Sequence, residues 1–73
     1  MDADDAAAAD QLTGRELLAL QLLACGYSVG RIAALLVAPS WQVAALLTSA
    51  AARLGARDRL EAVAVARQRR LIL

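Results

Sequence analysis

The chain has 73 residues, of which 60% are hydrophobic, 3% are aromatic and 21% are charged, and its formal net charge is +1. One cysteine and no histidine exclude an internal disulfide and a structural zinc site, so stability has to come from packing between helices or subunits. The composition also offers no nucleophile–base pair and no glycine-rich phosphate loop, so we expect neither catalysis nor a cofactor. Leu, Ala and Val residues without strand-like alternation predict an all-α fold.

The charge is divided between the two ends of the chain. Residues 1–16 carry −4, residues 53–70 carry +4, and all eight cations are arginines. We interpret residues 1–11 as an acidic, flexible arm and residues 12–73 as the folded domain. The arm is expected either to solubilise the chain or to compete with DNA phosphate for the arginines.

Residues 32–52 carry no charged side chain, which is about the length of a membrane span. Pro39 and the polar residues beside it would break a spanning helix at depth, so we expect two helices and no membrane partner. Residues 2–11 are acidic and polar and form no secretory signal, and we expect a cytoplasmic protein.

The first predicted helix begins with a capping box at Thr13 and Glu16, runs from Gly14 to about Cys25 and stops at Gly26. Its inward stripe is predicted to comprise Leu20, Leu23 and Ala24, widened by Leu17, Leu18 and Leu22. We expect Cys25 to be a small buried hydrophobe, because no histidine is present to activate it.

Two further helices follow, separated by Pro39. Ser28 is the predicted cap of a helix from Val29 to about Val37, and Ser40 is the predicted cap of a helix from Trp41 to Leu54 that ends at Gly55. The residues expected to face the core are Ile32, Ala33 and Leu36 in the second helix and Val43, Leu47, Ala50 and Leu54 in the third.

Asp58 and Glu61 form a second capping box, which predicts a fourth helix to about Arg69 or Arg70. Its apolar positions are Leu60, Val63, and Ala66 or Arg67, followed by Leu71, Ile72 and Leu73. Four short helices with loops of two to five residues predict a compact bundle that contains a helix-turn-helix unit.

Many positions between residues 12 and 72 also follow a known pattern: Leu12-Thr13, Arg15-Glu16, Leu20, Gly26, Ser28, Ile32-Ala33, Leu36, Val43, Leu54-Gly55, Arg59, Ala62-Val63, Ala66 and Leu71-Ile72. On these residues the chain resembles the C-terminal DNA-binding domain of LuxR/GerE/NarL-type transcription regulators. The resemblance implies a compact four-helix domain whose third helix enters the major groove and whose fourth often mediates dimerisation.

The departures from that family fall where its function would lie. The family usually has Lys where Ala44 stands, often has His where Leu46 stands, and usually has Glu where Leu18 stands. Ser or Thr is typical at residues 39 and 42, and polar or basic residues are common at 29 and 30. The side of the third helix that is expected to contact bases and phosphates therefore lacks the basic residues that the family usually has there.

The first functional hypothesis is a stand-alone LuxR-type transcription regulator with weak, dimer-dependent binding to double-stranded DNA, because affinity comes largely from neutralised phosphates. The candidate DNA contacts are Arg31, Trp41, Gln42, Ala45, Thr48, Ser49, Arg53 and Arg57. The alternative is a degenerate helix-turn-helix that no longer binds DNA and serves as a protein-interaction or oligomerisation module. Either a homodimer or a partner protein would use an interface composed of Leu17, Leu18, Leu46, Ala62, Val63, Ala66 and Arg67.

Overall fold

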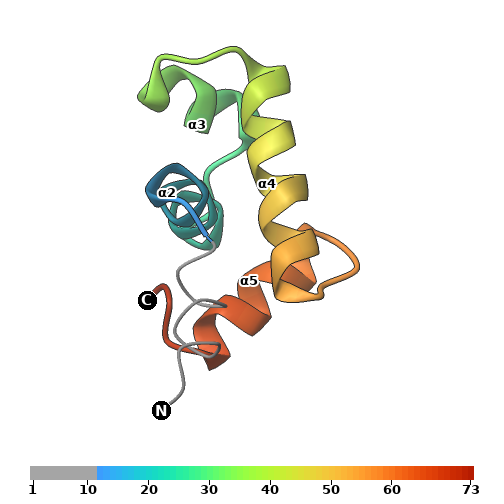
Figure 1. The fold of residues 1–73 in the computed structure, drawn as a ribbon. Coiled ribbons are helices and arrows are strands. Elements are labelled where there is room, and N and C mark those ends of the chain that lie inside the picture. The colour runs from blue at the N-terminus through green and yellow to red at the C-terminus, as the bar shows by residue number, and fades with distance from the viewer. Residues whose placement is uncertain (1–11) are drawn as a thin grey trace.

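The computed structural model describes residues 12–73, and the predicted acidic arm lies outside this range. The described part is all-α, as predicted, and consists of four helices without a strand: α2 (Gly14–Ala24), α3 (Val29–Leu36), α4 (Ser40–Leu54) and α5 (Arg59–Gln68). The longest helix, α4, packs against each of the other three (Figure 1). In Figure 1, α3 lies near the start of α4, α2 beside its middle and α5 at its end.

The predicted ends of α2 and α3 are confirmed. The Glu16 amide donates to the Thr13 hydroxyl at 3.1 Å and the Thr13 amide donates to the Glu16 carboxylate at 2.8 Å, which is a complete capping box. Gly26 follows α2 with φ of +97°, a conformation that glycine adopts without a Cβ clash. The Ser28 hydroxyl caps α3 by accepting the Arg31 amide at 3.2 Å.

The predicted cap at Ser40 is wrong. Pro39 occupies the N-cap position of α4 in an extended conformation, Ser40 is the first helical residue, and no side chain caps this end. The Pro39 carbonyl accepts the amides of Gln42 at 3.0 Å and Val43 at 3.2 Å, so the proline supplies the acceptor that begins the helix.

The predicted capping box of α5 is only half present. Asp58 accepts the Glu61 amide at 2.8 Å, as expected. The Glu61 carboxylate instead accepts the amide of Arg57, at 2.6 Å, because the loop brings that amide to the first turn of α5.

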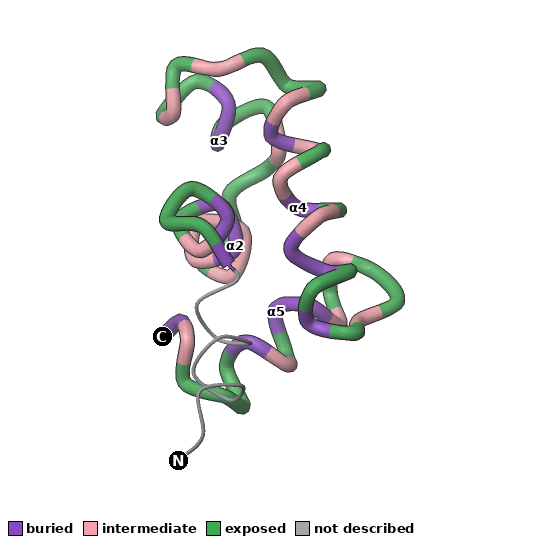
Figure 2. Tube along the Cα trace, in the orientation of Figure 1, coloured by how far each residue is buried: buried purple, intermediate pink, exposed green. Residues whose placement is uncertain are grey.

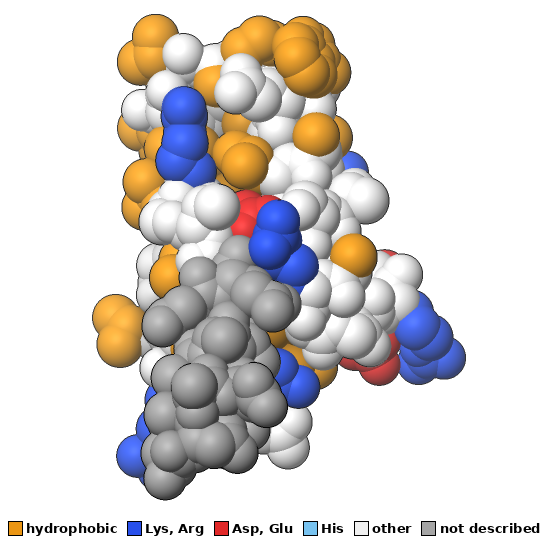
Figure 3. Space-filling view, viewed as in Figure 1, with side chains coloured by type: hydrophobic (Ala, Val, Ile, Leu, Met, Phe, Trp, Pro, Cys, Tyr) orange, Lys and Arg blue, Asp and Glu red, His pale blue; other side chains and the backbone are white. Residues whose placement is uncertain are grey.

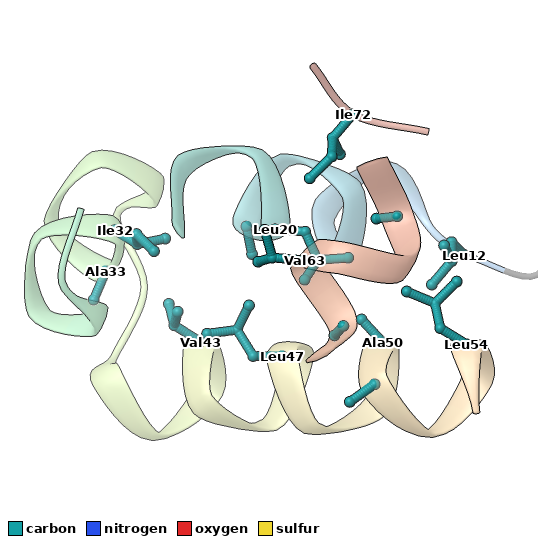
Figure 4. Close-up of a cluster of buried hydrophobic side chains, with 14 residues drawn as sticks. Leu12, Leu20, Ile32, Ala33, Val43, Leu47, Ala50, Leu54, Val63 and Ile72 are labelled. Carbon is teal, nitrogen blue, oxygen red and sulfur yellow. The ribbon is translucent and has the colours of Figure 1, made fainter. Parts of the chain in front are cut away.

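The core is built from all four helices and from the segments at both ends of the described chain. The buried apolar side chains are Leu12, Ala19, Leu20, Ile32, Ala33, Val43, Leu47, Ala50, Ala51, Leu54, Ala62, Val63, Ala66 and Ile72 (Figures 2 and 4). The predicted core row of α4 is therefore confirmed, whereas Leu23, Ala24 and Leu36 are only half-buried and pack against the edge of the core. The fully buried alanines allow the helix backbones to approach closely.

Two predicted core residues are on the surface. Cys25 is exposed, because it is the C-cap residue beyond the last turn of α2. Leu60 is 80% exposed, because α5 turns its alanine-rich side towards the core and Leu60 lies on the other side.

Within residues 12–73, no single helix is long and apolar enough to cross a membrane. In the same range of residues, α3 and α4 would be long and apolar enough only if they were counted as one segment, and they are bent by 107° at the break between them.

Candidate interaction surface on α3 and α4

The chain reverses between α3 and α4 through three residues, Val37, Ala38 and Pro39. The 107° bend between the two helices falls within the range of helix-turn-helix units, whose helices meet at roughly 90–120° through a three- to four-residue turn. The predicted break at Pro39 is thus confirmed. One end of the molecule consists of α3, this turn and the start of α4 (Figure 1).

Val37 makes the sharpest change of direction in the turn. Its φ of 54° and ψ of 52° are left-handed, and this conformation ends α3 by directing the Val37 amide to Ala34 at 3.3 Å and the Ala38 amide to Ala33 at 3.0 Å. A β-branched residue rarely adopts this conformation. The side chain is 91% exposed, so packing within the described chain does not compensate for the strain.

The outward side of α4 is opposite its core row. Trp41 is 72% exposed, and Ala45, Thr48 and Ala52 follow it at helical spacing and are also exposed. Ala44 is half-buried, so its position contributes only partly to the outward surface. The predicted orientation of Trp41 and Ala45 is confirmed.

An uncharged, largely apolar surface covers the end of the molecule formed by α3, the turn and the start of α4. We call it the apical surface, and it consists of Ala34, Leu35, Val37, Ala38, Pro39, Trp41 and Ala45. Its large side chains are substantially open to solvent, with Leu35 at 51% exposed in addition to Val37 and Trp41. Figure 3 shows hydrophobic side chains gathered at this end of the molecule. No charged residue occurs between Ile32 and Ala52.

The one arginine of α4, Arg53, is paired inside the domain. Its Nε lies 3.4 Å from the Glu16 carboxylate and donates to the Ser49 hydroxyl, also at 3.4 Å. Glu16 is buried, with only 3% of its side chain exposed. Burial raises the pKa of Glu16, but the Thr13 amide, the Ser49 hydroxyl and the Arg53 charge together outweigh burial, and the net pKa is lowered. The pair joins α2 to α4 and balances the Arg53 charge.

The remaining candidate DNA contacts are spread over a long stretch of the surface. Arg31 is exposed on the first turn of α3, and Arg57 is exposed in the loop after α4, where its Nε lies 3.4 Å from Glu61. Thr48 is exposed between them, whereas Gln42 and Ser49 are half-buried. Six of the eight predicted contacts lie on α4, and only some of these six point outward. They bring no positive charge to its first three turns, because Arg53 in the last turn is their only cation.

The predicted interface residues do not form one surface. Leu18 is 45% exposed, and Leu17 and Leu46 are half-buried. The prediction is wrong for three members of the set, because the structure buries them in the domain's own core: Ala62, Val63 and Ala66.

Arg67, the last predicted interface residue, has a structural role. Its guanidinium donates to the Ala24 carbonyl at 3.2 Å and to the Leu73 carbonyl at 3.1 Å. The Leu73 amide in turn donates to Gln21 at 2.8 Å. These bonds hold the C-terminal segment against the end of α2, and a cation there also interacts favourably with the helix dipole.

An open depression at the other end of α4 was not predicted, because it depends on how the loop after α4 and the start of α5 are placed beside the last turns of α4. Its volume is about 580 Å³ and its lining residues are Thr48, Ala51, Ala52, Ala56, Arg57, Asp58, Arg59 and Leu60. Both carboxylates near it have partners, since Asp58 caps α5 and Glu61 accepts the Arg57 amide. No group of His, Cys, Asp or Glu side chains that could hold a metal ion occurs in the part of the chain that the structure describes.

Comparisons with protein-family models, with curated proteins and with solved structures found no match to this chain.

Proposed function

We propose that this chain is a protein-interaction module of helix-turn-helix architecture, which binds its partner through the apical surface. The observation that carries the proposal is the exposure of Trp41, Val37 and Leu35 on the apical surface, whose seven residues carry no charge and which has exposed Arg31 at its edge, one helical turn before Leu35. An aromatic anchor among small apolar residues, with charged residues kept outside, is the usual composition of an interface centre. Monomeric proteins rarely leave such contiguous apolar surface uncovered.

Electrostatics weigh against DNA as the principal ligand. Most protein–DNA affinity comes from cations that neutralise phosphates, and the loss of two or three such contacts lowers affinity by roughly a hundredfold or more at moderate salt. On α4 the only cation is Arg53, whose charge is balanced by buried Glu16. A dimer formed through Ala62, Val63 and Ala66 would have restored affinity by avidity, but these side chains lie in the core.

DNA binding remains the second candidate, because the 107° bend and the exposed outward side of α4 are compatible with groove docking. In this candidate the chain is a LuxR-type regulator that contacts phosphates through Arg31 and Arg57 at either end of the unit. Such binding would be weak, salt-sensitive and dependent on dimerisation.

Photo-crosslinking distinguishes the two candidates. A photoreactive amino acid replaces Trp41 in the chain produced in its native host, and a matched control carries it at Leu60, which is 80% exposed in the first turn of α5. We expect a protease-sensitive, nuclease-resistant adduct from position 41 and none of the same mass from position 60. A nuclease-sensitive adduct from position 41 would overturn the proposal in favour of DNA.

A further inference from the structure

We infer that the acidic arm, residues 1–11, binds the arginines of α5 and keeps them from other anionic ligands. The arm itself lies outside the described residues. The inference concerns the end of the molecule opposite the apical surface, so it is independent of the proposed function. It is carried by the partners of the charged side chains and by the place where the arm joins the domain.

Three of the eight arginines have partners within the domain. Arg53 lies beside Glu16, Arg57 lies beside Glu61, and Arg67 donates to two backbone carbonyls. The guanidinium groups of the other five make no hydrogen bond or ion pair in the described part of the chain: Arg15, Arg31, Arg59, Arg69 and Arg70. The domain therefore has more arginines than it has carboxylates to pair with them.

The carboxylates that remain available are all in the acidic arm. Within residues 12–73, Glu16 and Glu61 are paired with arginines and Asp58 caps α5. The other four acidic residues of the chain precede Leu12: Asp2, Asp4, Asp5 and Asp10. Residues 12–73 carry eight arginines and three acidic residues, a formal charge of +5, against −4 in the arm.

Most of the unpartnered arginines lie at the two ends of α5. Arg59 is the first residue of this helix, and Arg69 and Arg70 follow its last; we call these three the α5 arginines. Arg69 and Arg70 are exposed and Arg59 is half-buried. One exposed ion pair contributes little, so three charges along one helix attract the arm more strongly than the separate arginines Arg15 and Arg31.

The arm joins the domain near the start of α5. Leu12 is 5% exposed in the core, and Figure 4 shows it at the same end of α4 as Leu54, five residues before α5 begins. Eleven extended residues span up to about 36–40 Å, whereas a ten-residue helix is about 15 Å long, so the arm can reach both ends of α5. Covalent attachment also gives the arm an effective concentration on the order of millimolar.

An arm bound in this way competes with anionic polymers for the same guanidinium groups. Exposed arginines attract phosphates without regard to sequence. By occupying the α5 arginines, the carboxylates of the arm lower the affinity of this end of the molecule for nucleic acid and other polyanions.

The first test follows the arm in the full-length chain labelled with nitrogen-15. Arg69→Gln/Arg70→Gln should move the amide chemical shifts of residues 2–8 towards the values that the wild-type chain shows in about 0.5 M salt, where exposed ion pairs are screened. The matched control, Arg15→Gln/Arg31→Gln, removes two equally exposed charges from α2 and α3 and should leave these shifts unchanged. All four positions are exposed, so the fold is kept in both variants.

The second test measures competition, with inorganic polyphosphate as the probe. Replacing all four arm aspartates by asparagine should tighten polyphosphate binding by about tenfold at low salt, because a tethered competitor is removed. The same replacement in the Arg69→Gln/Arg70→Gln background should have a much smaller effect, because the arm then has little left to cover.

Arm shifts that do not respond to Arg69→Gln/Arg70→Gln would overturn the inference. A gain in polyphosphate affinity of the same size with and without these two arginines would also overturn it, since net charge alone would then account for the gain. Neither result changes the crosslink expected at position 41, which tests the proposed function separately.

Discussion

Val37 determines how sharply the chain turns between α3 and α4, and its backbone is left-handed, a conformation that is strained for a residue with a β-branched side chain. The left-handed region costs an L-residue about 1–2 kcal/mol. The exposed side chain loses little packing when it is removed. We expect Val37→Gly to raise the free energy of unfolding by about 1 kcal/mol, after allowance for the greater freedom of glycine in the unfolded chain. Urea unfolding at a protein concentration that keeps the chain monomeric measures this change.

The matched control for Val37 is Ala34→Gly, at an exposed residue in the right-handed helix α3. This substitution should lower the free energy of unfolding by about 1 kcal/mol, the usual difference between alanine and glycine in a helix. Destabilisation of similar size in both variants would show that the backbone at Val37 is not strained.

Glu16 is the residue through which pH should act on stability. Its pKa is lowered below the ordinary value of 4.5 because the Thr13 amide, the Ser49 hydroxyl and the Arg53 charge outweigh the opposing effect of burial. A lowered folded-state pKa means that the ionised form stabilises the fold. That contribution is complete above pH 4.5 and is lost as the pH falls through the folded-state value.

We therefore expect Glu16→Gln to lower the free energy of unfolding at neutral pH by about 1–3 kcal/mol, the range for disrupting a buried hydrogen-bonded group. The difference from the wild-type chain should shrink as the pH falls below 4.5. Glu61→Gln, at a half-exposed ion pair, should cost less than about 1 kcal/mol at neutral pH. A deficit of Glu16→Gln that stays constant during acid titration would contradict the assignment.

At the scale of helices, the sequence predicted the elements well because independent local signals agreed. Capping residues at the start of three helices, glycines after two and apolar spacing in all four placed the same four helices. The orientation of α5 was harder to predict, since Leu60 and the Ala62–Ala66 side offered two overlapping apolar faces on a ten-residue helix. Close approach to neighbouring helices selected the small residues, and local periodicity carries no information about that approach.

Two glycines should respond in opposite ways to substitution by alanine, because one lies in the first turn of a helix and the other follows the end of a helix. Gly30 is exposed in α3, and an added Cβ would meet no atom within 4 Å. Gly30→Ala should therefore raise the free energy of unfolding by about 0.5 kcal/mol. Gly55 also has open space, but its φ of +72° is left-handed, so Gly55→Ala should lower stability by about 1 kcal/mol. Thermal unfolding measures both changes, and the same sign for the two variants would refute the distinction between them.

At the scale of the molecule, only part of the candidate surface could be predicted from the sequence. The break at Pro39 predicted two separate helices, and the resemblance placed Trp41 on the outward side of the second of them; Trp41 is 72% exposed. The hydrogen bond from Arg67 to Ala24 joins residues 43 apart in the sequence, so no local pattern predicted it. The left-handed backbone of Val37 was not predicted either, because a β-branched residue rarely adopts it. Three α5 residues that were predicted to lie in a dimer interface, Ala62, Val63 and Ala66, are instead buried in the core, because the neighbouring helices cover them.

Whether the outward side of α4 still fits a DNA groove can be decided by restoring charge to it. Lysines at exposed Ala45 and Thr48 would add two phosphate contacts if α4 enters the groove. The dependence of log K on log salt should then steepen by about 1.8, since each contact contributes about 0.9.

The control Ala64→Lys/Gln68→Lys adds equal charge to exposed positions of α5. A steeper slope only for Ala45→Lys/Thr48→Lys would show that the outward side of α4 fits a DNA groove and lacks only the charge to bind there. Equal slopes for the two variants would mean that the added lysines attract DNA wherever they lie and that α4 does not enter the groove. The DNA-binding candidate would then be contradicted by the shape of the surface as well as by its charge.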